Sequence, residues 1–234
     1  MAGQQDHAAP LSSKALNQAS AAAGTPLPRS FFAREPLVVA PELLGAVLVH
    51  TVDGASVAVR LTEVEAYLGE GEDPASHAHR GLRPRNAVMF GPPGHAYVYF
   101  TYGMHWCANV VCRQDGVSGG VLLRAGEVVA GHELARLRRP TARRDVDLAR
   151  GPARLANALA LTRADNGRDL CSGGELQMLA GGPAEPERLR TGPRVGVALG
   201  AASPWRFWLA DEPTVSIYRP SQPRRRQKSG GAQP

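Results

Sequence analysis

The chain has 234 residues, a formal net charge of +6 and three cysteines. This length can bury the core of one globular domain, while an odd number of cysteines without a Cys-x-x-Cys pair argues against both a disulfide framework and a zinc ribbon. This cysteine pattern suits the reducing cytoplasm, where we expect the protein to work. Because no apolar stretch approaches the roughly 20 residues that cross a bilayer, we expect no membrane segment.

Both ends of the chain are predicted to be disordered. Residues 1 to 29 are rich in Ala, Ser, Gln and Pro, and residues 220 to 234 are basic and contain no acid. Segments of such composition bury too little apolar surface to fold. We therefore expect one domain over residues 30 to 219, with a disordered tail on each side.

The net charge lies in the tails rather than in the domain. Residues 1 to 29 carry +1 and the five bases from Arg219 onward carry +5, so the residues between them sum to zero. Within this neutral region, residues 77 to 124 hold five arginines against Asp115 alone. A local basic patch of this kind favours contact with nucleic acid.

Lysine is almost absent, and arginine supplies the positive charge. The two lysines, Lys14 and Lys228, both lie in the predicted tails. The predicted domain therefore offers no lysine amine as a Schiff-base nucleophile, which argues against mechanisms of that class.

The domain is predicted to open with a short helix and a hairpin. We expect a helix over residues 36 to 45 and strands over 46 to 51 and 57 to 67, because Asp53-Gly54 is a strong two-residue turn signal. The two-residue period of the second strand places six side chains on one face: Val57, Val59, Leu61, Glu63, Glu65 and Tyr67. The side chains on that face should therefore be apolar where the strand lies in the core and acidic where it leaves the core.

A second hairpin is expected after the break at Gly91-Pro-Pro-Gly94, with strands at residues 95 to 101 and 105 to 112 and with Tyr102 at its tip. The remaining expected elements are a strand at 120 to 124, helices at 128 to 139 and 153 to 160, and strands at 175 to 179, 194 to 199, 206 to 209 and 214 to 219. Successive hairpins with a few helices predict an α+β fold, a single domain with a mostly antiparallel, curved β-sheet and a protruding β-hairpin.

Aromatic and imidazole side chains are concentrated in the segment from residue 61 to residue 112. It holds four of the five tyrosines and four of the seven histidines. Each of these residue types combines a flat stacking face with a hydrogen-bonding edge, and a protein needs both to hold a nucleobase. The carboxylate of Glu65 stands beside them in the sequence.

The most specific motifs fall in this segment and just after it. They are Glu63-Val-Glu65-Ala-Tyr67-Leu-Gly69, Pro84-Arg-Asn86, Met89-Phe90, Tyr97-Val-Tyr99-Phe-Thr-Tyr102-Gly-Met104 and Val121-Leu-Leu-Arg124-Ala. In order and spacing they resemble the alkyladenine (3-methyladenine) DNA glycosylase family. Collinear motifs are far more specific than one glycine signature, and the resemblance covers roughly residues 30 to 219.

The resemblance implies a monofunctional DNA glycosylase of base excision repair, which flips a damaged purine out of double-stranded DNA and hydrolyses its N-glycosidic bond. The expected lesions are 3-methyladenine, 7-methylguanine and hypoxanthine. Such an enzyme needs no cofactor, and we expect a monomer that works on the nucleoid in the cytoplasm. N3- or N7-alkylated purines leave easily because they are cationic, whereas hypoxanthine needs protonation or strong hydrogen bonding.

Glu65 matches the general base of the family. A carboxylate on the opposite side of the sugar from the departing base can stabilise oxocarbenium character and deprotonate a water molecule. An isolated Glu is more often a solvated strand acid, but the surrounding motif favours catalysis. Glu63 has a weaker claim and is a candidate for a structural acid.

The resemblance also assigns a base pocket. Tyr67, His77 and Tyr99 match its stacking walls, and Asn109 matches the residue that crowds the 2-amino group of guanine. Alternatively, the two tyrosines are aromatic residues of the core, His77 is a buried histidine with its hydrogen bonds made, and Asn109 caps a turn with its amide. The loop before His77 is slightly longer than in the family, which leaves His79 as a rival.

Three residues are expected to contact DNA. Tyr102 would fill the gap left by the flipped nucleotide, with Met104 beside it, and Arg124 would contact DNA near that nucleotide. The alternative for Tyr102 is an aromatic side chain packed under a neighbouring loop, and the alternative for Arg124 is a surface salt bridge. The cluster of Asp73, His77 and His79 lacks a known metal-ligand spacing, so no metal is expected.

Two other classes of function stay open. A non-catalytic module that binds damaged DNA or RNA would keep the stacking pocket without needing Glu65. A hydrolase of free nucleosides would keep Glu65 without needing Tyr102. A panel of lesion duplexes separates the three readings.

Overall fold

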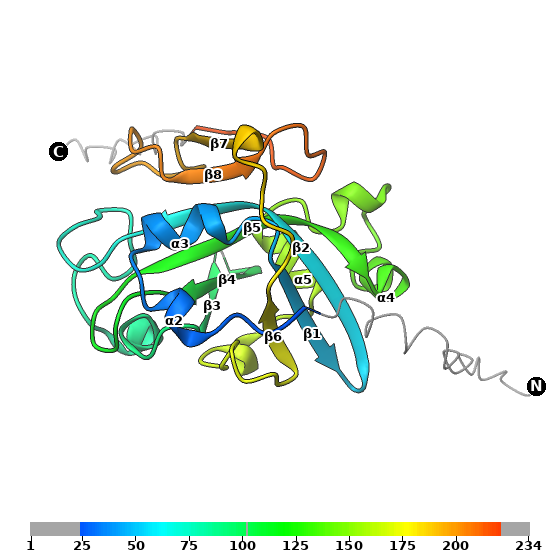
Figure 1. Ribbon diagram of the computed structural model, residues 1–234, viewed down its shortest axis with the longest axis horizontal. Coiled ribbons are helices and arrows are strands. Elements are labelled where there is room, and N and C mark those ends of the chain that lie inside the picture. The colour runs from blue at the N-terminus through cyan, green and yellow to red at the C-terminus, as the bar shows by residue number, and fades with distance from the viewer. Residues whose placement is uncertain (1–23, 102, 221–234) are drawn as a thin grey trace, which may run out of the picture.

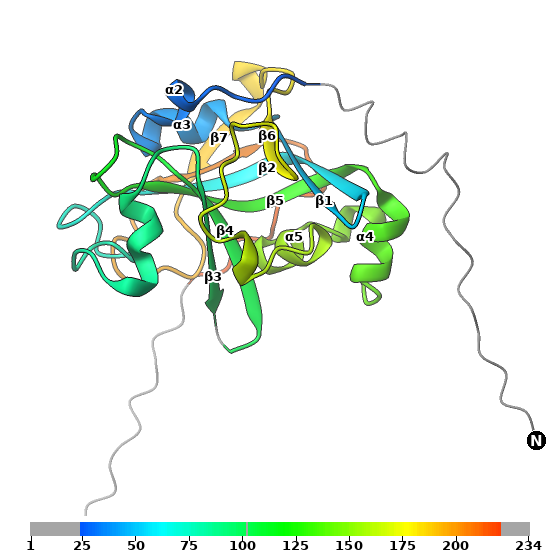
Figure 2. The same cartoon turned by 90° about the horizontal axis from the view of Figure 1, so that it is seen from below.

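The computed structural model describes residues 24 to 101 and 103 to 220, which form a curved antiparallel sheet with a few short helices (Figures 1 and 2). The predicted α+β class and single domain are confirmed. The strands follow the order β3-β4-β5-β2-β1-β6, and β8 pairs with both β2 and β7. They are β1 (Val47–Val52), β2 (Ala55–Tyr67), β3 (Ala96–Thr101), β4 (His105–Val111), β5 (Gly120–Ala130), β6 (Leu176–Leu179), β7 (Leu189–Gly192) and β8 (Arg206–Leu209).

The helices flank the sheet. They are α2 (Arg29–Phe32), α3 (Pro36–Glu42), α4 (His132–Arg138) and α5 (Pro152–Ala158), with 3-10 turns η2 (Pro84–Phe90), η3 (Asp145–Asp147), η4 (Arg163–Asp165) and η5 (Pro186–Arg188). Helix α3 packs on β2 and β5, and α5 packs on β4 and β5. In Figure 2, α2 and α3 lie above β2 and β5, and α4 and α5 lie below them. Within the described residues, no helix has both the length and the apolar character to cross a membrane.

The first hairpin forms as its turn residues predict. Asp53 and Gly54 have φ angles of 51° and 76°, and a two-residue turn whose central residues both have positive φ matches the twist of the flanking strands. The turn aligns Val52 with Ala55 and sets the register of β1 on β2.

A β-bulge in β2 overturns the predicted face of its carboxylates. The pairing of β2 with β5 shifts register on both sides of Glu63. Before the bulge, Val57, Val59 and Leu61 enter the main core cluster; after it, Val64 and Ala66 enter instead. The extra residue inverts the alternation, because side chains on a strand have a period of two. Glu63 and Glu65 therefore lie opposite the main core and do not share a face with Leu61.

Strand β2 also changes partner at the bulge. One edge of β2 pairs with β1 up to Arg60 and with β8 from Glu63 to Glu65, while β5 follows the other edge. Figure 1 shows β7 and β8 lying apart from β1 and β6. The two glutamates thus lie where the sheet divides, which gives them neighbours from more than two strands.

Three predicted elements differ in the structure. The helix expected over 128 to 139 starts only at His132, because β5 runs to Ala130 and Gly131 turns the chain with a φ of 76°. A Cβ at Gly131 would collide with the carbonyl oxygen of Ser56. The segments 194 to 199 and 214 to 219 are not strands, and β7 was not predicted.

The predicted tails are only partly described. Residues 1 to 23 and 221 to 234 lie outside the described residues. Of the predicted N-terminal tail, residues 24 to 29 are described, and there Pro26 bridges Leu179 while the backbone N–H of Leu27 donates to Met178 O at 2.8 Å. These residues therefore extend the contacts of the domain upstream of residue 30.

We expect position 126 of β5, which pairs with β2 where the register shifts, to accept only glycine. In Gly126→Ala, the new Cβ would collide with the carbonyl oxygen of Arg60 and the side chain of Val59, so unfolding in urea should show a loss of about 1–3 kcal/mol. Gly182→Ala is the control, because nothing lies within 4 Å of its Cβ. Equal stabilities of the two variants would contradict the close packing at the bulge.

Candidate active site

Five strands bring a row of side chains together on one face of the sheet. Directly paired positions across β3, β4, β5, β2 and β8 are Tyr97, Asn109, Leu122, Glu65 and Arg206. Paired residues of neighbouring strands point to the same side, so these side chains share the face opposite the main core. We call it the site face. The row places two predicted site residues, Glu65 and Asn109, on adjacent parts of one surface.

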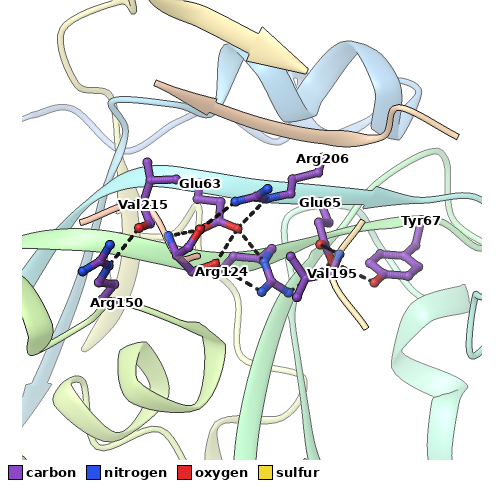
Figure 3. A network of polar contacts seen from close by, with 9 residues as sticks. Glu63, Glu65, Tyr67, Arg124, Arg150, Val195, Arg206 and Val215 are labelled. Atoms are coloured by element: carbon purple, nitrogen blue, oxygen red, sulfur yellow. Dashed lines mark hydrogen bonds and ion pairs between the residues drawn. The ribbon is translucent and has the colours of Figure 1, made fainter. Parts of the chain in front are cut away.

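Glu65 is fully buried, with 0% of its surface exposed, and its carboxylate is held from several directions (Figure 3). The backbone N–H of Val195 donates to Oε1 at 2.7 Å, and the hydroxyl of Tyr67 donates to Oε2 at 2.9 Å. The Arg124 guanidinium lies 3.3 Å from Oε2. A buried carboxylate requires such partners, and charge-assisted hydrogen bonds of this kind also fix its orientation.

The environment of Tyr67 makes it a hydrogen-bond donor. Burial, and after it the charge of Glu65, raise the pKa of Tyr67 well above its ordinary value of 10.0. Tyr67 therefore stays protonated at neutral pH. Burial and the neighbouring Cys107 and Tyr97 raise the pKa of Tyr99 well above its ordinary value, with a smaller contribution from Glu65, so Tyr99 also stays protonated at neutral pH.

Glu63, two residues before Glu65, is the centre of a second buried network. Its Oε1 accepts from Arg124 Nε at 2.7 Å, Arg206 Nε at 2.8 Å and Ser216 Oγ at 2.9 Å, and its Oε2 accepts from the backbone N–H of Ser216 at 2.6 Å. Burial by itself would raise the pKa of Glu63, but Arg124 and Arg206 outweigh it and hold the pKa below the ordinary value. These contacts suit a structural acid, the role suggested by its sequence.

Arg124 joins the two glutamates. Only 6% of the residue is exposed, and its guanidinium contacts Glu63 through Nε and Glu65 through Nη1 (Figure 3). Burial lowers the pKa of Arg124, but Glu65 and Glu63 more than compensate and raise it. The predicted alternative of a surface salt bridge does not describe this geometry, since the ion pairs are buried.

The aromatic residues form a second cluster on the site face. Tyr97 and Tyr99 stack with centroids 5.4 Å apart, and the His77 ring meets Tyr99 edge-on at 4.6 Å. His77 Nδ1 lies 3.1 Å from the Tyr97 hydroxyl. Partial burial and the charge of Arg85 lower the pKa of His77, so its ring is mostly neutral at pH 7 and can both donate and accept.

A cavity of about 570 Å³ opens beside this cluster. His77, Tyr97 and Tyr99 line it, together with residues of η2, η4 and the hairpin: Pro84, Arg85, Val98, Phe100, Thr101, Trp106, Arg163 and Asn166. Glu65, Tyr67 and Asn109 are not part of this lining. The structure thus brings His77 and Tyr99 to this cavity and places Glu65 and Tyr67 together in a polar cluster outside its lining.

The two remaining pocket candidates are distinguished by their surroundings. Asn109 lies within β4, 7% exposed, and its side-chain amide donates to Tyr97 O at 3.3 Å, so it does not cap a turn. His79, the rival of His77, has a buried Nδ1 without a hydrogen-bond partner among the described residues. Of the two histidines, His77 is the one that contacts the tyrosines.

The hairpin of β3 and β4 projects from the body of the domain (Figure 2). Tyr102 lies outside the described residues. Next to it, Gly103 has a φ of 67°, and Met104 is 66% exposed. Phe100, on the outgoing strand, is 52% exposed. Large apolar side chains this exposed are available for contact with another molecule.

Several contributors to the site were missing from the sequence prediction. Val195 acts through its backbone, which leaves no trace in residue type. Arg206 lies in a strand that was predicted, but its pairing with β2 was not. Tyr97 could have been found, because it alternates with Tyr99 on β3. Across the described residues, no group of three or more His, Cys, Asp or Glu side chains is arranged to hold a metal ion.

Comparisons with known proteins give one consistent result. A family model described as Methylpurine-DNA glycosylase (MPG) matches residues 30–213. The protein named putative 3-methyladenine DNA glycosylase of Streptomyces avermitilis is 57% identical over 206 residues, covering 87% of this chain and 96% of that protein. Proteins with the same name from Frankia casuarinae and Leifsonia xyli are 54% and 52% identical, covering 83% and 82% of this chain and 93% and 92% of theirs.

We expect Glu63→Gln to lower the free energy of unfolding by about 3–5 kcal/mol at pH 7, because Arg124 and Arg206 would remain buried without their anion. Since the folded protein lowers the pKa of Glu63, its ionisation stabilises the fold above the unfolded pKa, and this contribution is lost as the pH falls through the folded value. Urea titrations at roughly pH 3 to 7 should therefore show a shallower acid decline in the variant.

Glu127→Gln is the control for this measurement. Glu127 also pairs with an arginine, Arg60, but its side chain is 50% exposed, and exposed pairs contribute about 0–1 kcal/mol. Equal losses in the two variants, or parallel pH profiles of wild type and Glu63→Gln, would contradict the role of Glu63 as a buried structural anion.

Proposed function

This chain belongs to the methylpurine-DNA glycosylase family and is a DNA glycosylase, and we propose that it is a monofunctional hydrolase in which Glu65 activates water. In the proposed reaction, water adds to the anomeric carbon of the deoxyribose as the bond to the purine breaks. Glu65 takes the proton of the water, and the purine leaves with the bonding electrons. The product is an abasic site in otherwise intact DNA.

The observation that carries this proposal is the way Glu65 is held. Oε2 accepts from Tyr67 and faces Arg124, whereas Oε1 accepts only from Val195 among the described residues. A carboxylate oxygen has two lone pairs, so one lone pair of Oε1 has no donor among the described residues. Arg124 supplies the countercharge, and the fixed orientation aims that lone pair at one position, as a general base requires.

The aromatic cluster suits the recognition of an extruded base. Stacking on tyrosine contributes about 1–3 kcal/mol per base, which offsets part of the cost of removing the base from the duplex. The neutral ring of His77 can hydrogen-bond to the edge of a base. We propose that Tyr67, His77 and Tyr99 hold the purine and that Asn109, next to Tyr97 on the site face, excludes the 2-amino group of normal guanine.

We propose double-stranded DNA with a damaged purine as the substrate and a monomer as the acting form. The exposed hairpin would enter the duplex, with Tyr102 and Met104 at the position of the flipped nucleotide. Cationic lesions such as 3-methyladenine and 7-methylguanine are the preferred substrates because they are good leaving groups, and hypoxanthine is a slower one. The lack of lysine in residues 30 to 219 agrees with a mechanism that uses water and no amine.

Glu65→Gln should abolish most of the activity while leaving DNA binding intact. The test incubates the protein with duplexes that carry 3-methyladenine or hypoxanthine and reveals abasic sites as strand breaks after alkali. We expect wild type to yield breaks only after alkali, and Glu65→Gln to be slower by about 10²–10⁴-fold, the range for loss of a general base.

Each other outcome has a clear meaning for this assignment. Tight binding without breaks in wild type would favour a non-catalytic damage-recognition module. Breaks without alkali would contradict monofunctional action. An unchanged rate in Glu65→Gln would remove Glu65 as the base, and activity on free nucleosides equal to that on duplexes would indicate a nucleoside hydrolase.

We expect Met104→Ala to weaken binding to a lesion duplex without lowering stability. Met104 is 66% exposed at the hairpin, so its removal should change the free energy of unfolding by less than about 0.5 kcal/mol. Leu137→Ala on α4 is the matched control, since Leu137 is 71% exposed and lies on another part of the surface. Fluorescence anisotropy with a labelled duplex measures both, and equal affinities would argue against hairpin entry.

A further inference from the structure

Arg194 is the largest fully buried side chain of the described residues, and 1% of it is exposed. Its Nη1 donates to Asp73 Oδ2 at 2.6 Å and its Nη2 donates to Asp73 Oδ1 at 2.9 Å, a two-pronged ion pair. Nη1 also donates to Ala66 O at 3.0 Å, and Ala66 follows Glu65 on β2. One guanidinium therefore ties a carboxylate of the loop after β2 to the end of β2 itself.

The guanidinium of Arg194 also packs on aromatic faces. Its central carbon lies 4.5 Å from the centroid of the Tyr67 ring and 4.9 Å from that of Trp205. Such stacking fixes the plane of an aromatic ring as well as attracting it. The hydroxyl end of Tyr67 donates to Glu65. Arg194 therefore packs on the face of the Tyr67 ring while Glu65 holds its hydroxyl group.

Arg194 also fixes the position of the group that donates to Oε1 of Glu65. Val195 follows Arg194 directly, and its backbone N–H is the donor 2.7 Å from Oε1 (Figure 3). An N–H donor can be aimed only by fixing the backbone around it. The buried side chain of Arg194 anchors this backbone on Asp73, in a segment that is not part of a strand or helix.

Asp73 organises the other side of the ion pair. Besides Arg194, it accepts from the backbone N–H groups of Leu68 at 3.2 Å and Ala75 at 3.0 Å. These bonds shape the loop that leaves β2 and leads to His77, which lines the cavity. A single ion pair thus contacts the end of β2, the loop of His77 and the segment of Val195.

Stability alone does not account for such a pair. Replacing a buried ion pair by apolar residues is often neutral or stabilising, because two charges must lose their hydration. Arg194 Nε, moreover, is buried without a hydrogen-bond partner among the described residues, which adds an unfavourable term. The property that such a pair provides, and that apolar packing lacks, is a defined geometry between the three segments.

We propose that Asp73 and Arg194 are positioning residues of the active site: their ion pair aligns Tyr67 and the Val195 N–H on Glu65 and fixes the loop that carries His77. This role rests on the proposed function, because it concerns the rate at which Glu65 activates water. Neither residue touches the reacting atoms. The effect is on the alignment of groups that do.

The test compares wild type with Arg194→Lys and Asp73→Asn in single-turnover excision from a hypoxanthine duplex, with the enzyme in saturating excess. Lysine keeps the charge but lacks the planar fork and the stacking surface. Misplacement by about 1 Å can reduce a rate by 10²-fold, so we expect a saturating rate constant about 10- to 100-fold lower in both variants. A merely unfolded fraction would change the enzyme concentration needed, and not the rate constant at saturation.

Glu212→Gln is the matched control. Glu212 also binds two arginines, Arg60 at 3.1 Å and Arg188 at 3.0 Å, with 10% of its side chain exposed. Its contacts lie among β2, η5 and the loop after β8, away from Glu65. We expect it to lose stability in urea while keeping the wild-type rate constant.

Trp205→Leu decides the question if the charged variants do not fold, since it loosens Arg194 while leaving the ion pair and Glu65 in place. We expect it to lower the saturating rate constant about 3- to 10-fold. The positioning role would be overturned if Arg194→Lys and Asp73→Asn fold and keep the wild-type rate constant. If those two variants do not fold, a wild-type rate constant in Trp205→Leu would overturn it. An inactive wild type would instead overturn the proposed function, so the two failures are distinguishable.

Discussion

The pairing of charges inside the domain is the constraint on which the rest of the site depends. Strand β2 buries two carboxylates, Glu63 and Glu65, each with 0% of its surface exposed. Ions removed from water are tolerated only when charges and hydrogen-bond donors surround them. Arg124 from β5, Arg206 from β8 and the N–H groups of two loops meet this requirement. The position of β8 beside β2 and the course of the C-terminal loops follow from the same need.

The sequence predicts the local elements well because their signals are local. Asp53-Gly54 specifies its hairpin through positive φ angles, and the alternation in β3 and β4 specifies the second hairpin. The motif around Glu65 and the order of the later motifs predict the family correctly, since the family model matches residues 30–213. Of the three expected pocket walls, His77 and Tyr99 contact each other, while Tyr67 contacts Glu65 instead.

The remaining features could not be predicted because they depend on contacts between distant residues. The bulge at Glu63 arises from pairing with β5 and turns the carboxylates away from Leu61, contrary to the simple period of two. Segments 194 to 199 and 214 to 219 have the composition of strands, but Val195 and Ser216 direct their N–H groups to carboxylates instead of to a neighbouring strand. Asp73 and Arg194, which pair in the structure, are 121 positions apart.

The use of backbone donors at Val195 and Ser216 has a consequence for how this site can diverge. An N–H group belongs to every amino acid except proline, so the hydrogen bond to Glu65 places no demand on the side chain at position 195. For this bond, only proline is excluded at position 195, and any other limit on the residue comes from the packing of its side chain. The alignment of the carboxylate is thus built into the course of the main chain, and a change in that course would disturb it even where every side chain of the site is kept.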